Sequence, residues 1–205
     1  SEEAIGNSNS NDHKIITKLP KVPNNITNIK EWINSNILKS LTLLKTSSVY
    51  GVLLHEPNQL LNPNGNEIYR SLKKLKDQDL IKNIGISIYD PLQLDNIIPM
   101  YDFDIVQSPL NILDRRILDS GWARKLQTKG IKLHVRSIFL QGLLLMNKEN
   151  RDLKFNRWSP LWSEWEDWLS RNNINALSAC LNFALHSNNV DKVIIGLQNV
   201  EQFEE

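Results

Sequence analysis

Short apolar runs alternate with longer amphipathic segments along the whole chain. The run at 49–54 is rich in β-branched residues and lacks a helical period, which is typical of a strand buried on both faces. Similar short runs give candidate strands at 14–20, 49–57, 83–89, 103–109, 132–139 and 192–198. Between them, segments such as 28–45 and 65–81 repeat apolar residues at helical spacing. This alternation predicts an α/β fold with parallel strands and helical crossovers.

Polar residues stand at the ends of several predicted strands. The run VYGVLLHEP ends in His55, and Pro57 takes the chain out of the sheet because proline cannot continue a central strand. The other strand-end polar residues are Lys18, Ser87, Gln107, Arg136, Ser137 and Gln198. Each alone has a structural explanation, as a solvated strand end or a partner for loop backbone groups. In a (β/α)₈ barrel, however, such ends converge on one mouth.

Two parallel architectures fit the alternation, a barrel and an open doubly wound sheet. The open sheet usually carries a glycine-rich phosphate loop, and neither GxGxxG nor GxxxxGK[ST] occurs in a chain with only 8 glycines. Their absence favours the barrel. The length of 205 residues suits one domain, so we expect a single barrel domain over residues 1–205.

Charge and cysteine content narrow the functional classes. Lysine and arginine total 24 against 23 acidic residues, so the chain has no excess of positive charge that would indicate binding to nucleic acid or to a membrane surface. A small molecule remains as the expected ligand. We predict no metal site. The single cysteine, Cys180, lies in the helix-like stretch ALSACLNFALH, which indicates a buried structural thiol rather than a nucleophile. No long apolar span or signal segment occurs, so we expect a soluble cytoplasmic protein.

Four tryptophans gather in the stretch RWSPLWSEWEDWL. Their spacings of four, three and three residues place them on one side of a helix. Such a face is more typical of packing on the barrel, or on a partner, than of a cofactor site. These residues are Trp158, Trp162, Trp165 and Trp168.

Six stretches, in order, resemble strands three to eight of the aldo-keto reductases. These stretches are IITKLP, VLLHEP, LIKNIGISIYDPLQL, DIVQSPLNILDRR, VRSIFLQGLLL and VIIGLQNVEQFEE. HEPNQLL, ISIYDP and VRSIFLQGLL are most similar to members found with bacterial surface-polysaccharide genes. The resemblance implies a (β/α)₈ TIM barrel, of which this chain carries strands 3 to 8.

The resemblance also implies a reaction and a catalytic pair. Members move a hydride from NADPH, or from NADH, to a small-molecule carbonyl, and a tyrosine supplies the proton. Lys18 matches the catalytic lysine, which lowers the pKa of the tyrosine, and His55 matches the histidine that hydrogen-bonds the carbonyl oxygen. The matching cofactor-binding residues are Ser87, Gln107, Arg136, Ser137, Gly196, Gln198, Gln202 and Glu205.

The chain departs from the family pattern at three cofactor positions. Ile88 stands where asparagine is common, and Arg136 stands where an aromatic ring usually stacks on the nicotinamide. Gln202 stands where many members hold the 2′-phosphate with arginine, so NADH remains an alternative to NADPH.

The family tyrosine and its aspartate lie in a segment resembling D-T-A-x-x-Y-G-x-S-E. The chain starts SEEAIG, which is similar to the residues after that Tyr-Gly, so we expect both groups upstream of Ser1. We therefore expect a piece of a longer enzyme, inactive alone, with natural truncation as the alternative. A catalytically silent barrel that serves binding or regulation is the competing function. Substrate identity and oligomeric state are left open.

Overall fold

Six parallel strands form one sheet whose order follows the chain. The structure, a computed structural model, describes residues 1–8, 13–197 and 199–204. Each strand has a parallel neighbour in register, from β1 with β2 through to β5 with β6. The strands are β1 (Ile16–Leu19), β2 (Gly51–Leu54), β3 (Ile84–Ser87), β4 (Ile105–Pro109), β5 (Lys132–Arg136) and β6 (Lys192–Val193). The six predicted strands and their parallel arrangement are confirmed, and together they form a half-barrel.

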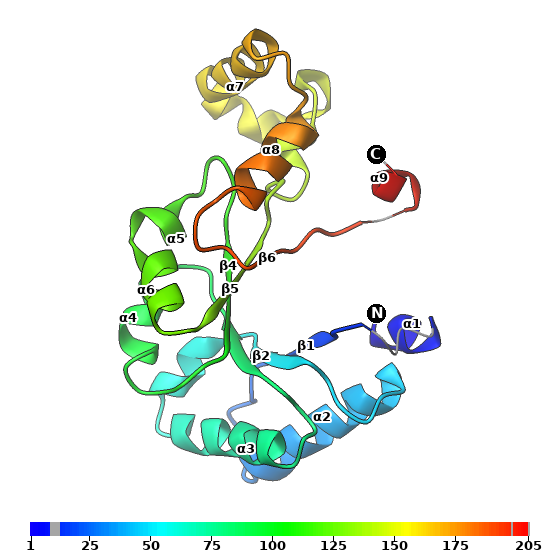
Figure 1. The fold of residues 1–205 in the computed structure, drawn as a ribbon, viewed down its shortest axis with the longest axis vertical. Coiled ribbons are helices and arrows are strands. Elements are labelled where there is room, and N and C mark those ends of the chain that lie inside the picture. Colours follow the sequence, from blue (N-terminus) through cyan, green and yellow to red (C-terminus); the bar gives the residue numbers. More distant parts are fainter. Residues whose placement is uncertain (9–12, 198, 205) are drawn as a thin grey trace.

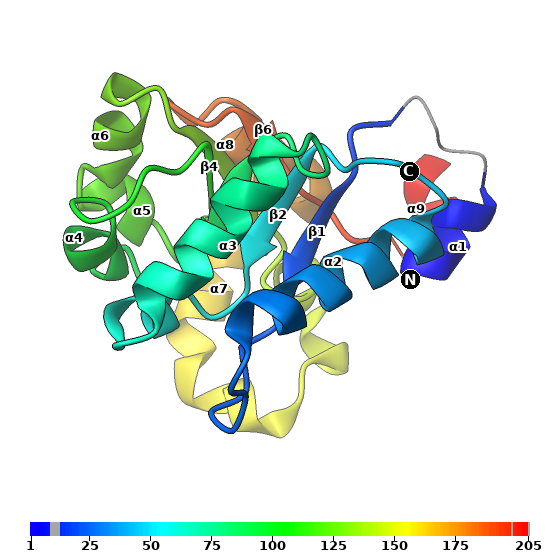
Figure 2. The same cartoon turned by 90° about the horizontal axis from the view of Figure 1, so that it is seen from below.

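Helices connect the strands and cover the outside of the sheet (Figure 1). The α-helices are α1 (Glu2–Asn7), α2 (Ile29–Leu44), α3 (Gly65–Asp77), α4 (Gln93–Ile97), α5 (Arg116–Asp119), α6 (Trp122–Thr128), α7 (Ser159–Arg171), α8 (Ala176–Leu185) and α9 (Glu201–Glu204). Short 3₁₀ helices are η1 (Pro57–Leu61), η2 (Leu143–Leu145), η3 (Lys148–Asn150) and η4 (Leu153–Trp158). In Figure 2, α2 and α3 lie side by side against β1 and β2. No helix of the described residues is long and apolar enough to cross a membrane.

Local signals fix the ends of the longest helix, α2. The side chain of Asn28 accepts a hydrogen bond from the Glu31 backbone N–H, which caps the helix start. At the other end Lys45 adopts a left-handed conformation with φ of 52°, and its N–H bonds back to the last turn. The apolar face between these ends is buried against the sheet, as the helical spacing predicts.

The strand β6 is shorter than the predicted run of 192–198. Its ladder with β5 ends where the Ile194 N–H donates to the Val135 carbonyl at 2.7 Å. Beyond that point β5 turns away, because Ser137 has a φ of 61° and no longer offers an extended partner. Residues 194–197, which follow β6, are therefore exposed and include Gly196.

A second apolar cluster lies beyond the ends of β4 and β5, where α7 and α8 pack on each other (Figure 1). Trp162 and Trp165 are buried there, which confirms the predicted tryptophan-bearing helix face. Trp158 precedes the helix as its N-cap residue instead of joining that face. Cys180 is also buried in this cluster, and burial raises the pKa of its thiol to about 11, as befits a structural cysteine.

Candidate active site at the strand ends

Three polar side chains form a chain of contacts across neighbouring strand ends. The Nζ of Lys18 donates to the Oγ of Ser87 at 3.5 Å, and this hydroxyl donates to the Oε1 of Gln107 at 3.3 Å. Ser87 and Gln107 are paired in the β3–β4 register and are almost completely buried. Parallel strands bring their carboxyl ends to one edge, so residues 69 and 20 positions apart meet as predicted.

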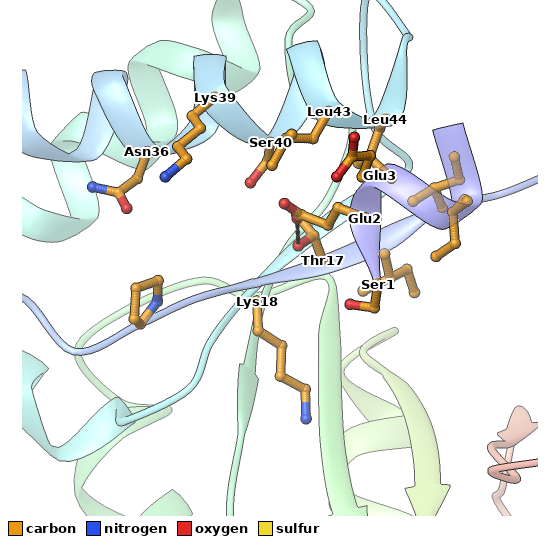
Figure 3. Close-up of a pocket in the computed structure, with 14 residues that line it drawn as sticks. Ser1, Glu2, Glu3, Thr17, Lys18, Asn36, Lys39, Ser40, Leu43 and Leu44 are labelled. Atoms are coloured by element: carbon orange, nitrogen blue, oxygen red, sulfur yellow. Dashed lines mark hydrogen bonds between the residues drawn. The ribbon is translucent and has the colours of Figure 1, made fainter. Parts of the chain in front are cut away.

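Strand alternation aims Lys18 toward the barrel interior. Its neighbour Thr17 points the other way and donates to Glu2 of α1 at 2.5 Å. Figure 3 shows Lys18 extending away from the groove that Thr17 and Glu2 line. This groove, of about 710 Å³, runs between α1, β1 and α2, next to the β1 edge opposite β2. Successive side chains on a strand face opposite sides, so Lys18 faces the cavity inside the half-barrel.

Arg136 sits at the end of β5 and is held by its neighbours. Its Nη1 donates to the Oγ of Ser137 at 3.1 Å, and its Nη2 donates to the Ile88 carbonyl at 3.2 Å. The guanidinium lies 4.7 Å from the centroid of the Tyr89 ring, a cation–π contact. Its Nε is buried and has no hydrogen-bond partner among the described residues. Arg136 is thus fixed in place while keeping one donor unsatisfied.

Cationic side chains outnumber carboxylates around the cavity inside the half-barrel, where Lys14, Lys18, Lys132, Arg136 and Lys192 line it together with one acid, Asp191. Within residues 1–8, 13–197 and 199–204, neither Lys18 nor Arg136 makes a salt bridge. Desolvation, followed by the charge of Arg136, lowers the pKa of Lys18 from its ordinary value. Both residues line one cavity of about 790 Å³ together with Gln107. Such a cavity suits a ligand with negative or electron-rich groups.

His55 is brought to the same edge of the sheet but makes no side-chain hydrogen bond in the described part of the chain. Its backbone N–H donates to the Leu19 carbonyl at 3.0 Å, which holds the end of β2 beside the end of β1. Its side chain is exposed and therefore accessible to a ligand.

Two of the remaining predicted cofactor residues lie in the part of the chain that follows β6. Gly196 is exposed on the segment after β6, and Gln202 lies on α9, where its backbone N–H donates to the Asn199 side chain at 2.9 Å. Gln198 and Glu205 lie outside the described residues.

None of the four tyrosines makes a hydrogen bond to Lys18 or His55 in the described structure. Three hydroxyl groups contact other partners, Lys132 and the carbonyls of two residues on the outside of the sheet. The ring of the fourth lies against Arg136. The tyrosines are Tyr50, Tyr69, Tyr89 and Tyr101. None therefore contacts the two predicted catalytic residues as a proton donor.

Asn111 is a site residue that the sequence reasoning missed. It is 1% exposed, and its Nδ2 donates to the Ser137 carbonyl at 3.2 Å. Its Oδ1 accepts from the backbone N–H groups of Leu113 and Asp114 at 3.0 and 2.8 Å. The loop after β4 is thereby tied to the loop after β5. The asparagine in SPLNILD is a possible turn signal, but no sequence pattern reveals its second partner.

A second missed feature is the backbone after β5. Leu140, Gln141 and Gly142 have φ values of 48°, 56° and 86°, a run of left-handed residues that begins three positions after Ser137. Only glycine adopts this conformation without cost, so the two non-glycine residues hold strain of about 1 to 3 kcal/mol each. Strain of this kind concentrates at ligand-binding loops.

Comparison with known proteins gives the same assignment. Residues 1–205 match the model of the Aldo/keto reductase family. Aldo-keto reductase AKR11C1 from Bacillus halodurans aligns with a TM-score of 0.75 at 20% identity, over 99% of this chain and 68% of that one. Glycerol dehydrogenase AKR11B4 from Gluconobacter oxydans gives 0.75 at 18%, over 98% and 69%. A search of the curated proteins finds no match. With its whole length matching the family and its half-barrel matching part of the family barrel, the chain belongs to the aldo/keto reductase family.

Proposed function

We propose that the chain contributes the catalytic face of an enzyme that reduces a small carbonyl compound with NADPH or NADH. The observation that carries the proposal is Lys18, which makes no salt bridge within the described residues and shares one cavity with Gln107 and Arg136 in an aldo/keto reductase half-barrel. Family membership supports an oxidoreductase in general terms. The roles of individual residues below are part of the proposal.

Lys18 is proposed to tune a tyrosine that acts as the acid of the reaction. A phenol has an ordinary pKa of about 10 and is a weak acid near neutral pH. A nearby ammonium stabilises the phenolate and lowers that pKa. Lys18 suits this task because its charge has no carboxylate partner in the described structure and is partly desolvated.

His55 is proposed to orient the carbonyl group. Its exposed side chain stands at the end of β2, one strand away from Lys18, and can donate a hydrogen bond to the carbonyl oxygen. That bond strengthens as negative charge develops on the oxygen. Lys18 and His55 thus act from adjacent strands, one on the acid and one on the substrate.

The strand-end residues fit a nicotinamide dinucleotide. A bound nicotinamide supplies the hydride, while the chain's residues hold and orient the cofactor. The excess of cationic side chains in this cavity suits the phosphates of the cofactor. The proposed contact residues are Ser87, Gln107, Arg136, Ser137, Gly196, Gln198, Gln202 and Glu205.

The test uses the protein that contains residues 1–205, with Lys18→Met and a matched control, Lys14→Met. Lys14 lines the same cavity two residues before β1 begins, so both variants remove one cation from the cavity. We expect Lys18→Met to lower kcat by about 100-fold or more with little change in cofactor Kd, because removing support for a general acid slows only the chemical step. Lys14→Met is expected to leave kcat within about threefold.

A catalytically silent barrel is the second candidate, and one observation favours it. None of the four tyrosines makes a hydrogen bond to Lys18 or His55 in the described structure. The same experiment separates the two functions. Cofactor binding without carbonyl reduction, in the wild-type protein, supports the silent barrel and refutes the enzyme.

A further inference from the structure

A second cavity lies between α7, α8 and the loop after β4. Its volume is about 540 Å³, within the range of about 300 to 1,000 Å³ that small-molecule sites occupy. The apolar part of the cavity wall is formed by Ile112, Leu161, Trp165, Trp168 and Phe183. Among the predicted cofactor and catalytic residues that the structure describes, none lines this cavity, so it is separate from the strand-end site.

Two stacked indoles give the cavity a flat aromatic wall. The rings of Trp165 and Trp168 lie 5.7 Å apart with an interplanar angle of 9°. Trp165 is buried and its Nε1 donates to the Leu144 carbonyl at 3.2 Å, which fixes the inner ring. Trp168 covers it and is 42% exposed. A planar apolar ligand can extend this stack at little cost, because the wall is already ordered.

The cavity is also edged by positive charge. The guanidinium of Arg115 lies 5.8 Å from the Phe183 ring centroid, and Arg171 lines the cavity from the end of α7. Within the described ranges, neither arginine forms a salt bridge. Glu164 is the acidic residue of the lining, so the two guanidinium groups leave an excess of one positive charge. Guanidinium groups bind carboxylates through paired hydrogen bonds.

From the stacked indoles and the two arginines, we propose that this cavity binds a small organic carboxylate with a planar aromatic body. The ring stacks against Trp168, and the carboxylate faces Arg115 and Arg171. The site is independent of the carbonyl-reducing site, but Ile112 directly follows Asn111, which is bonded to the Ser137 carbonyl. A ligand in this cavity would therefore lie next to the loop that is proposed to hold the cofactor.

The probe is naphthylacetate, and its neutral amide, naphthylacetamide, is the matched control ligand. Binding to the full chain is followed by the indole N–H signals in NMR. Trp32 on α2 and Trp122 on α6 serve as internal references, because neither lines the cavity and both helices lie away from α7 (Figure 1). We expect the signals of Trp165 and Trp168 to shift on addition of naphthylacetate. The carboxylate should bind about five- to tenfold more tightly than the amide, with the difference shrinking at high salt.

Two variants and their controls locate the site. Arg115→Gln should abolish the preference for the carboxylate, and Trp168→Ala should weaken both ligands by about tenfold. Arg157→Gln and Trp158→Ala are the controls, because Arg157 lies over the Trp158 ring at 3.8 Å and Trp158 is 40% exposed, outside the cavity. Both controls should bind like the wild type.

Three outcomes overturn the proposal. The first is equal affinity for acid and amide in the wild type, and the second is a loss of binding in the control variants that matches the loss in Trp168→Ala. The third is an absence of shifts together with a dimer whose dissociation exposes Trp168, which would assign this face to a second copy of the chain. Cofactor binding is measured separately, so its failure leaves this site unaffected.

Discussion

Replacing Asn111 with alanine tests whether the loops around the mouth are held by one buried side chain. The substitution removes three hydrogen bonds, to the Ser137 carbonyl and to the N–H groups of Leu113 and Asp114. Each such bond contributes about 1 kcal/mol net, and a buried group left without a partner costs about 1 to 3 kcal/mol. Because Leu113 is 39% exposed, water can reach part of this loop, so we expect a loss of about 2 to 4 kcal/mol.

The loss is measured as the change in the free energy of unfolding in urea. Asn111→Asp is the informative companion, because a carboxylate keeps the acceptor for two N–H groups and loses the donor to Ser137. At neutral pH its buried carboxylate would also face the Ser137 carbonyl with no donor between them, so Asn111→Asp should lose at least as much stability as alanine. Asn24→Ala, at an exposed position, is the control. A change below about 0.5 kcal/mol for Asn111→Ala, the usual effect of a surface substitution, would refute the reasoning.

Three further predictions concern charge and packing inside the half-barrel. Arg136→Gln should raise the pKa of Lys18, because the variant loses a neighbouring cation. The alkaline limb of the kcat/KM profile should then move to higher pH, and an unchanged limb would contradict the influence of Arg136 on Lys18. Burial lowers the pKa of His134, so the unfolded chain binds the proton more readily, and stability should decline as pH falls through about 6.5. His134→Gln should flatten that decline in urea titrations. Gly85→Ala should cost about 3 kcal/mol in the same assay, because the new Cβ would overlap the backbone oxygen of Ile105 on the neighbouring strand β4. A stability equal to that of the wild type would show that the two strands can separate.

The strands were predictable because each is a short apolar run that a polar or turn residue terminates. Parallel strands then place their ends together, so the contact of Lys18 with Ser87, and of Ser87 with Gln107, follows from the pattern. The extent of β6 was not predictable. Its apolar residues continue past Val193, but pairing depends on β5, which turns at Ser137.

Other parts of the site depend on contacts that leave no trace in a single sequence. The bond from Asn111 to the Ser137 carbonyl joins two loops 26 residues apart, and only the fold brings them together. The left-handed residues Leu140 and Gln141 lack the glycine that usually marks such backbone. The stacking of Arg136 on Tyr89 likewise depends on the course of two loops and not on spacing.

Transfer of a deuterium label from reduced nicotinamide to the product is the most direct test of the central claim. The measurement is a single turnover of the protein that contains residues 1–205, with deuterated NADPH and an aldehyde, followed by mass spectrometry of the alcohol. The account predicts label on the former carbonyl carbon, with a transfer rate about 100-fold or more lower in Lys18→Met. Absence of label in the wild-type product, or equal transfer rates in both proteins, would contradict it.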